Sequence, residues 1–414
     1  MKHIIIGAGA AAISAVKRIR KEKPEDNIVI ISQDEKVYSR CMLHKVISGE
    51  RSEENINFVN DDLFNAPNIT WIKGKTVTKL DPKSKAVYAG EEKLDTGDTI
   101  LIATGANSVI PPIGELKTAK NVFGLRHLHD VRAIIKNIKE AEKIAVIGGG
   151  LVGLDAVYGI LEAGAEKKID VIEMAPRLLA INLDDKAAES YQKLFEQRGV
   201  KFHLSRKMVN TKSTGDNISS LELDDGTIID CDMVIVAVGV SPASAFTTDI
   251  ELTERRAIKV NEYLETSIPG IYAAGDAAGL SGIWPNAKKQ GDIAAYNMTG
   301  TKWAYDDLFA FKTTINFFNL LSLSLGIISP QEGDEVLVKE DRENYRRLIL
   351  REGTPVGIIL QGEIGGSGFW QHLIKNSIPI SNICSITGKS PWKISYADFF
   401  GLEENGEYKW MTIQ

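Results

Sequence analysis

Residues 3–32 read HIIIGAGAAAISAVKRIRKEKPEDNIVIIS, and this stretch decides the fold of the first part of the chain. The apolar run at residues 4–6 is short enough for a buried parallel strand, and after a glycine turn the apolar residues recur at helical spacing. Pro24 ends that helix, and a second apolar run leads to Ser32. The stretch therefore predicts a βαβ unit, with two parallel strands joined by a helix.

The same pattern returns at residues 143–174, which read KIAVIGGGLVGLDAVYGILEAGAEKKIDVIEM. Residues 144–147 predict the strand, and Val157, Ile160 and Leu161 mark the buried face of the helix. The chain is thus predicted to contain two separate nucleotide-binding folds. Further buried strands are predicted in DTILIATGANSVIPPIG (98–114), DMVIVAVGVSP (232–242) and ETSIPGIYAAGDAA (265–278).

The order of these elements predicts an α/β protein with two Rossmann-like dinucleotide-binding domains. Near the end, the strand-like segments VLVKE, YRRLILRE and PVGIILQGEI predict a C-terminal α+β domain. The predicted boundaries are 1–113 and 244–310 for the two parts of the first domain, 114–243 for the second, and 311–414 for the C-terminal domain.

The composition fits a globular protein of several domains, because 43% of the 414 residues are hydrophobic and 25% are charged. The net charge of -6 gives no global positive field, so we expect no nucleic-acid partner. The longest strongly apolar stretch, residues 315–328, is interrupted by asparagine and serine and is too short to span a bilayer. We therefore expect no membrane segment.

The three cysteines, Cys41, Cys231 and Cys384, are far apart in the sequence, which is typical of a reducing compartment. They cannot alone hold a four-cysteine zinc or iron–sulfur site, and we expect no metal site. The N-terminal residues do not resemble a secretory signal, so a cytoplasmic protein is expected.

The first glycine motif can hold a pyrophosphate. Gly7 permits the tight turn, Gly9 lets a pyrophosphate approach the helix N-terminus, and the small Ala12 lets helix and strand pack closely. Ser32 stands where an acidic ribose ligand is usual, so the ribose contact is left open.

The second motif, Gly148-x-Gly150-x-x-Gly153, is complete, and Glu173 follows about 20 residues later at a strand end. A carboxylate there accepts both ribose hydroxyls and repels a 2′-phosphate, which favours NAD over NADP. Arg177 lies nearby, so the choice between NADH and NADPH stays open.

With these motifs, residues 1–300 resemble the FAD-dependent pyridine-nucleotide-disulfide oxidoreductases. Four landmarks match in order: GAGAAA, the ATG of residues 103–105, GGGLVG and the AAGD that ends at Asp276. The resemblance implies that the first domain binds FAD, with Asp276 on the ribityl chain, and that the second binds NAD(H). It implies an FAD set of Gly7, Gly9, Ala10, Ala12, Ser32, Gln33, Arg40, Ala103, Thr104, Gly105, Gly275 and Asp276, and an NAD set of Gly148, Gly150, Val152, Gly153, Glu173 and Gly239.

The segment YSRCMLHK, residues 38–45, is similar to the YxRPxLSK stretch of ferredoxin and rubredoxin reductases and of proteins of the apoptosis-inducing-factor type. In those relatives the terminal lysine lies by flavin N5 and pairs with an acid just after the second glycine motif, which implies catalytic roles for Lys45 and Asp155. A lysine there would stabilise negative charge on reduced flavin. The alternative is a surface lysine and a helix aspartate that never meet.

Cys41 replaces the proline of that stretch. Coenzyme A disulfide reductases and NADH oxidases of the same superfamily carry one redox cysteine near this place, and a cysteine beside Arg40 could act as a thiolate. The surrounding residues lack the pattern of those enzymes, and most free cysteines are small buried hydrophobes. Cys41 is therefore a candidate catalytic residue of lower rank than Lys45 and Asp155.

Three further features allow two interpretations each. Residues 284–291, WPNAKKQG, predict a helix whose positive end faces the flavin or only packs on the sheet. His127 and His129 have HxH spacing but no third ligand in the sequence, and His44 is a pocket wall or a proton carrier. The C-terminal FWQHLIK, in a domain that resembles that of NADH:rubredoxin reductases and nitrite reductase flavin halves, is a dimer or partner face, or core.

These features together predict an NADH-dependent FAD oxidoreductase that passes hydride to flavin N5 and electrons to a small iron–sulfur carrier, rubredoxin or ferredoxin. One alternative is a single-cysteine thiol enzyme that uses Cys41. Another is the flavin subunit of a larger complex with a cluster-bearing redox partner. The direction of electron flow and a possible homodimer stay open.

Overall fold

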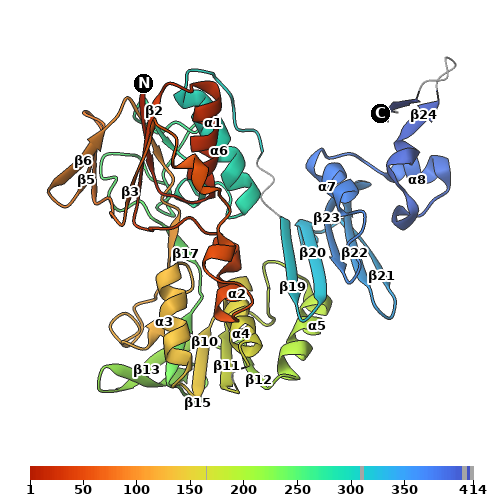
Figure 1. Ribbon diagram of the computed structural model, residues 1–414. Coiled ribbons are helices and arrows are strands. Elements are labelled where there is room, and N and C mark those ends of the chain that lie inside the picture. The colour runs from red at the N-terminus through yellow and green to blue at the C-terminus, as the bar shows by residue number, and fades with distance from the viewer. Residues whose placement is uncertain (165, 308–311, 403–407, 411–414) are drawn as a thin grey trace. The chain divides into compact units, whose positions relative to one another are not determined.

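The computed structural model describes residues 1–164, 166–307, 312–402 and 408–410 (Figure 1). These residues form two compact units, of which unit 1 comprises Met1–Ile172 with Arg206–Ala310, and unit 2 comprises Glu173–Ser205 with Phe311–Gln414. The predicted boundary between residues 310 and 311 lies outside the described residues. The division into three domains therefore stays a prediction.

A five-stranded parallel sheet forms the first half of unit 1. Its strands, in spatial order, are β18 (Ile271–Ala273), β7 (Thr99–Ile102), β1 (Lys2–Ile6), β2 (Asn27–Ser32) and β3 (Ile69–Lys73). Alternate residues of β1 point to opposite faces of the sheet, since Ile5 packs in one core cluster while Ile4 and Ile6 pack in the other. Both faces of the sheet are thus buried, as expected for parallel strands.

Two helices lie side by side against this sheet, α1 (Ala10–Glu22) and α6 (Trp284–Met298), as Figure 1 shows. Gly291 allows this close packing, because a Cβ there would lie 2.0 Å from the Ala11 carbonyl oxygen. The helix predicted within residues 3–32 is α1, and residues 284–291 begin α6. A separate antiparallel sheet consists of β4 (Lys79–Asp81), β5 (Ala86–Ala89) and β6 (Glu92–Thr96), and its Leu80 and Val87 pack in the same core cluster as Ile4 and Ile6.

A second parallel sheet in unit 1 has the strand order β11 (Lys168–Glu173), β10 (Lys143–Ile147), β16 (Met233–Val236) and β9 (Val122–Phe123). The helices of this part are α3 (Leu128–Ile138) and α4 (Leu151–Glu162). The remaining strands of unit 1 are antiparallel: β13 (Met208–Thr214), β14 (Asn217–Leu223) and β15 (Ile228–Asp230), and β8 (Ala106–Ser108) with β17 (Val240–Pro242).

Short helices fill several connections of the chain. The α-helix α2 spans Leu43–Ile47, and 3-10 turns span Arg40–Met42, Glu54–Ile56, Asp61–Leu63, Gly275–Ala277, Pro391–Lys393 and Tyr396–Phe399. Within the described ranges, no helix combines the length and apolarity that crossing a bilayer requires.

Unit 2 contains a five-stranded antiparallel sheet in the order β19 (Lys312–Phe317), β20 (Leu320–Gly326), β23 (Thr354–Gln361), β22 (Tyr345–Arg351) and β21 (Glu335–Glu340). The three strand-like segments predicted near the end are β21, β22 and β23. The apolar residues 315–328 form most of the β19–β20 hairpin. These sheets confirm the predicted class of two Rossmann-like folds and a C-terminal α+β fold.

Helix α5 (Asp185–Glu196) is joined to this sheet through Tyr191, whose hydroxyl contacts the Leu320 carbonyl at 2.9 Å and Ser322 Oγ at 2.9 Å. The FWQHLIK segment lies in α7 (Ser367–Lys375) and turns its large apolar side chains inward, since Phe369, Trp370, Leu373 and Ile374 are buried. Unit 2 also contains β12 (Val200–Leu204), α8 (Ser381–Thr387), β24 (Phe400–Leu402) and β25 (Tyr408–Trp410).

Candidate functional site

A cavity of about 640 Å³ opens in unit 1 where β1, β2, β7 and β18 end. This volume lies within the range of roughly 300–1,000 Å³ that is typical of small-molecule sites, and the carboxyl ends of parallel strands are where such sites form. Every residue of the predicted FAD set except Ala12 lines the cavity. Ala12 lies in α1 and is fully buried in the core, as its predicted packing role requires.

The glycine turn after β1 has the shape that a pyrophosphate needs. Gly7 adopts φ +113°, and a Cβ there would lie 2.3 Å from the Ala103 carbonyl oxygen, so no other residue fits. Gly9 precedes the first turn of α1, and both glycines line the cavity. The amide groups of that first turn carry the positive end of the helix dipole. The residues present therefore fit the phosphates of a dinucleotide such as FAD.

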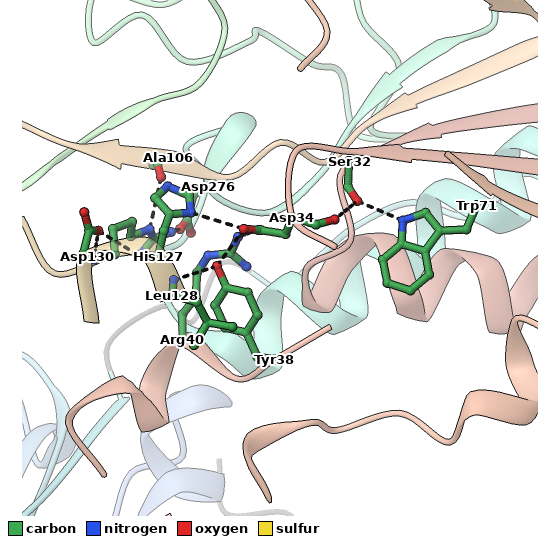
Figure 2. A network of polar contacts seen from close by, with 11 residues as sticks. Ser32, Asp34, Tyr38, Arg40, Trp71, Ala106, His127, Leu128, Asp130 and Asp276 are labelled. Atoms are coloured by element: carbon green, nitrogen blue, oxygen red, sulfur yellow. Dashed lines mark hydrogen bonds and ion pairs between the residues drawn. The ribbon is translucent and has the colours of Figure 1, made fainter. Parts of the chain in front are cut away.

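Asp34 organises a polar network at the end of β2, which Figure 2 shows. Its carboxylate accepts hydrogen bonds from Arg40 at 2.9 Å and from the Tyr38 hydroxyl at 3.0 Å. Ser32 Oγ donates to the Asp34 carbonyl oxygen at 2.6 Å and accepts from Trp71 Nε1 at 2.9 Å. The Ser32 hydroxyl is thus already engaged, and Asp34, one of the two acids just beyond Ser32 in the sequence, holds Arg40 at the cavity.

Arg126 lines the cavity but was not among the site residues predicted from the sequence. Its guanidinium pairs with Asp276, the predicted ribityl ligand, and Arg126 Nε donates to the Ala106 carbonyl at 3.1 Å. Both charged residues line the cavity. No local sequence motif marks Arg126, because 150 residues separate it from Asp276.

His127 follows Arg126 and is buried, and neither of its ring nitrogens has a hydrogen-bond partner among the described residues. Its Nδ1 lies 4.0 Å from Asp34, too far for a hydrogen bond (Figure 2). Its ring stacks on that of His129, with the ring centroids 5.1 Å apart. Burial, with the positive charge of Arg40, lowers the pKa of His127 to about 4. Within the described ranges no third ligand joins this histidine pair.

The second glycine turn repeats the geometry of the first. Gly148 adopts φ +112°, and a Cβ there would lie 2.4 Å from the Ala237 carbonyl oxygen, while a Cβ at Gly153 would lie 1.9 Å from the Gly148 carbonyl oxygen. A Cβ at Gly150 would have no protein atom within 4 Å, so a side chain at this position would contact only a bound ligand. Gly239 also has a positive φ of +126°, and Val152 is 39% exposed on the first turn of α4.

Glu173 is the last residue of β11 and follows Ile172, whose carbonyl accepts a hydrogen bond from the Gly148 amide at 2.8 Å. The Glu173 carboxylate accepts from the Ala175 amide at 2.7 Å. Arg177 instead binds the Leu183 carbonyl and pairs with Asp185 at 3.1 Å. The roles of the predicted NAD residues stay predictions.

Lys45 and Asp155 lie on two packed helices, α2 and α4, but their ion pairs differ from the predicted one. Lys45 Nζ contacts Glu50 at 2.5 Å and lies 4.9 Å above the centre of the Tyr158 ring, whereas Asp155 lies 3.6 Å from His44 Nδ1. Burial raises the pKa of Asp155 to about 8, although the positive charge of Lys45 opposes this rise. Their catalytic roles stay predictions.

Cys41 lines the cavity, and all three cysteines are free thiols. Desolvation by neighbouring protein atoms, followed by the negative charge of Asp155, raises the pKa of the Cys41 thiol, although part of the residue is exposed. The thiol of Cys41 is therefore protonated at neutral pH in this arrangement, which disfavours spontaneous thiolate chemistry.

Comparisons with known proteins agree with this geometry. The family described as pyridine nucleotide-disulphide oxidoreductase matches residues 1–291, and the rubredoxin NAD+ reductase C-terminal domain matches residues 312–378. A nitrite reductase [NAD(P)H] of Bacillus subtilis is 28% identical over 396 residues, which cover 94% of this chain and 49% of that protein. The chain thus spans about half the length of this relative.

An NADH oxidase of Methanocaldococcus jannaschii is 35% identical over 328 residues, with 73% of this chain and 71% of that protein covered. The crystal structure of an NADH:rubredoxin oxidoreductase from Clostridium acetobutylicum superposes with a TM-score of 0.75 at 25% identity, covering 92% of this chain and 97% of that one. The chain therefore belongs to the pyridine nucleotide-disulphide oxidoreductases, a family that uses FAD and NAD(H).

Proposed function

We propose that the protein is an NADH-dependent FAD oxidoreductase that passes electrons between NAD(H) and a small iron–sulfur carrier, rubredoxin or ferredoxin. The observation that carries the choice of acceptor is the C-terminal sheet of unit 2, because residues 312–378 match the C-terminal domain of rubredoxin NAD+ reductases. The similarity to an NADH:rubredoxin oxidoreductase over nearly the whole of both chains supports the same choice.

Two groups of residues that line the cavity would bind different parts of FAD. The turn from Gly7 to Gly9 and the first amides of α1 would hold the pyrophosphate, together with Arg40, whose Nη1 lies 3.4 Å from the position of a Cβ at Gly9. Asp276, fixed by Arg126, would accept hydrogen bonds from the ribityl hydroxyls. When bound, FAD supplies hydride acceptance at N5 and one-electron transfer to a carrier.

The second glycine turn would bind NAD(H) in the same way. The open space at Gly150 lets a pyrophosphate approach the N-terminus of α4, and Glu173 would accept the adenosine ribose hydroxyls. A carboxylate in this position repels a 2′-phosphate, and Arg177, which follows in the sequence, pairs with Asp185. We therefore expect NADH to be preferred over NADPH.

A reductive titration tests this proposal directly. The purified protein would be titrated without oxygen with dithionite and then with NADH, while the electrons taken up per flavin are counted from the visible spectrum. Two electrons per FAD are expected, because no second redox centre is proposed. NADH-dependent reduction of rubredoxin and of ferredoxin would then be compared with reduction of oxygen and of coenzyme A disulfide. Activity with oxygen or the disulfide alone contradicts an iron–sulfur acceptor.

The thiol enzyme is a second candidate because Cys41 lines the cavity. In that case the titration would consume four electrons per FAD, and Cys41→Ser would abolish turnover. In the proposed carrier reductase, Cys41→Ser leaves rubredoxin or ferredoxin reduction largely intact. Cys384→Ser serves as the control, since this thiol lies in α8 of unit 2.

The third candidate, a flavin subunit of a larger redox complex, is favoured by the nitrite reductase relative, of which this chain covers 49%. It predicts co-purification with a cluster-bearing protein and negligible carrier reduction by the isolated chain. Full activity of the isolated chain with a small carrier argues against it.

A further inference from the structure

Strand β21 is an outer strand of the antiparallel sheet in unit 2, as Figure 1 shows. Within the described residues it pairs only with β22, in a regular antiparallel register along its whole length. No residue of β21 is buried, and the side chains of Val336 and Val338 leave these residues 37% and 54% exposed. An edge strand with exposed β-branched residues is a template on which a further strand can pair.

The alternation of hydrogen bonds between β21 and β22 determines which backbone groups face outward. Just beyond β21, the Asp341 amide donates to the Asn344 carbonyl at 3.0 Å, so these two residues form a hydrogen-bonded pair. In an antiparallel ladder such pairs recur at every second residue. The amide and carbonyl groups of Val336, Val338 and Glu340 therefore point away from β22. Among the described residues, no other group forms a hydrogen bond with them.

Side chains hold β21 in place at both of its ends. Asp334, just before the strand, has a side chain that is 2% exposed and binds Arg351 of β22 through two contacts, at 2.8 and 2.9 Å. At the other end, Glu340 pairs with Lys186 of α5 at 3.0 Å. The strand is thus ordered before any partner pairs with it, which lowers the entropic cost of that pairing.

The sequence of β21, EVLVKE, is complementary to itself in an antiparallel register. When Leu337 lies on a two-fold axis, Val336 of one copy lies opposite Val338 of the other, and Glu335 lies opposite Lys339. The outward backbone groups of the valines then face each other, as a hydrogen-bonded pair requires. The opposite charges lie in non-hydrogen-bonded pairs, where the side chains are closer together.

Neighbouring registers lack this charge complementarity. The outward backbone groups would also allow the axis to lie one residue earlier or later than Leu337. An axis one residue earlier places Lys339 opposite Gly333, and an axis one residue later places Glu335 opposite Asp341, where like charges repel. The side chains therefore select the register that is centred on Leu337.

The charges at these positions are not balanced within one chain. Lys339 lies opposite Arg346 of β22, and like charges in this arrangement are unfavourable. Arg346 pairs with Glu363 at 2.9 Å, but among the described residues no carboxylate pairs with Lys339 and no cation pairs with Glu335. Both side chains are exposed. A second copy of the chain would supply the missing opposite charge at each position.

We propose that the protein forms a two-fold symmetric dimer in which the β21 strands of two copies pair in antiparallel register, centred on Leu337, and join two sheets into one. The symmetry covers both open edges, so the assembly closes at two copies. A contact of six residues per copy buries less than the roughly 1,200–2,000 Å² of standard stable interfaces. We therefore expect a reversible dimer that dissociates on dilution.

The test measures the dimer dissociation constant of the full-length protein by sedimentation velocity over a range of concentrations. Lys339→Glu places two carboxylates opposite each other at both ends of the paired strands, and should raise the dissociation constant about tenfold or more. Glu335→Lys should have the same effect through two cations. An equimolar mixture of these two variants re-forms both ion pairs and should contain a heterodimer as tight as the wild-type dimer.

Lys193→Glu is the matched control, because it makes the same change of charge on α5, where the Lys193 side chain is 62% exposed. It should leave the dissociation constant unchanged. Amide hydrogen exchange locates the interface in the wild type. The peptide that contains Val336 and Val338 should exchange more slowly as the protein concentration rises.

Four results would overturn the proposal. The wild type could stay monomeric at every concentration, or dimerise without protection of the β21 peptide. The dissociation constant could be the same in Lys339→Glu and Glu335→Lys as in the wild type, or the mixture of the two variants could be no tighter than either variant alone. None of these readouts involves NADH or an electron acceptor, so the outcome is independent of the proposed function.

Discussion

Arg126, which precedes α3, forms an ion pair with Asp276, in the 3-10 turn after β18, across 150 residues of sequence. Both side chains are about one-fifth exposed, at 19% and 21%, and both line the cavity. Arg126 also donates to the Ala106 carbonyl, so its guanidinium is fixed on two sides. This arrangement orients the one carboxylate that the AAGD motif brings to the cavity.

Asp276→Asn tests the proposed contact with the ribityl chain. The substitution preserves shape but removes the charge, and a hydrogen bond to a charged group contributes about 1.5–3 kcal/mol. We expect FAD to bind the apoprotein about 10- to 100-fold more weakly, measured by quenching of flavin fluorescence. Asp292→Asn is the control and should retain wild-type affinity, because Asp292 lies in α6, is paired with Arg18 and is not among the cavity-lining residues. Equal affinity of the two variants for FAD would show that Asp276 does not contact the ribityl chain.

Gly150→Ala separates ligand binding from folding in the second glycine turn. Gly150 has φ -78° and its Cβ direction is open, so alanine should leave the stability within about 0.5 kcal/mol. The added methyl group occupies the space through which a pyrophosphate would approach, and the KM for NADH should rise about tenfold or more. Steady-state kinetics with a fixed acceptor concentration provide the measurement.

Gly368→Ala is the matched control, since Gly368 in α7 also faces open space but lies in unit 2. It should leave the KM for NADH unchanged. An unchanged KM in Gly150→Ala would show that no dinucleotide approaches this turn. Gly148→Ala, unlike Gly150→Ala, should disturb folding itself, because its Cβ would clash with the Ala237 carbonyl oxygen.

Local patterns predicted the parts of the fold that depend on short stretches of sequence. The φ values of Gly7 and Gly148 follow from the tight turns that their motifs require, and the strands beside them follow from short apolar runs. The third small residue, Ala12, lies in the core as its packing role predicted.

Contacts between distant segments could not be predicted in this way. Asp34 holds Arg40 by a hydrogen bond that depends on how the loop after β2 folds, and the FAD motif contains no such residue. The neighbour of Lys45 is Glu50, because the chain turns back after α2 and Arg51 donates its amide to the Lys45 carbonyl. The resemblance to known reductases indicated which residues are important, but not which of them touch.

His127→Phe tests how a buried histidine limits stability in acid. The pKa of His127 is lowered to about 4 in the folded protein, against about 6.5 in an unfolded chain. Between these values the unfolded state binds more protons, so stability that is present at pH 7 is lost as the pH falls from about 6.5 toward 4. This one residue accounts for a loss of about 2 kcal/mol at pH 5.

His127→Phe removes this loss and leaves no unpaired buried nitrogen. The variant should match or exceed wild-type stability at pH 7 and be more stable at pH 5, as measured by urea unfolding at both pH values. An equal loss of stability between pH 7 and pH 5 in wild type and His127→Phe would show that other groups cause the loss in acid.

Tyr191→Phe tests whether α5 is anchored to the C-terminal sheet by a single hydroxyl. Tyr191 is fully buried, and its hydroxyl lies 2.9 Å from the Leu320 carbonyl, 2.9 Å from Ser322 Oγ and 3.2 Å from the Ile315 carbonyl. Removing this oxygen takes one hydrogen bond from its buried partners, which costs about 1–3 kcal/mol, although Ser322 Oγ still accepts from Gln361 Nε2 at 3.0 Å.

Urea unfolding of Tyr191→Phe should therefore show a lower midpoint at an unchanged slope. The matched control is Tyr396→Phe in the same unit, since that side chain is 43% exposed and its hydroxyl makes one contact, 3.3 Å from the Gly368 carbonyl. It should cost less than about 0.5 kcal/mol, because water replaces a hydrogen bond that is lost at the surface. Equal costs in the two variants would mean that the buried hydroxyl of Tyr191 adds nothing beyond an exposed one, and that apolar packing around Phe195 and Phe317 holds α5 to the sheet.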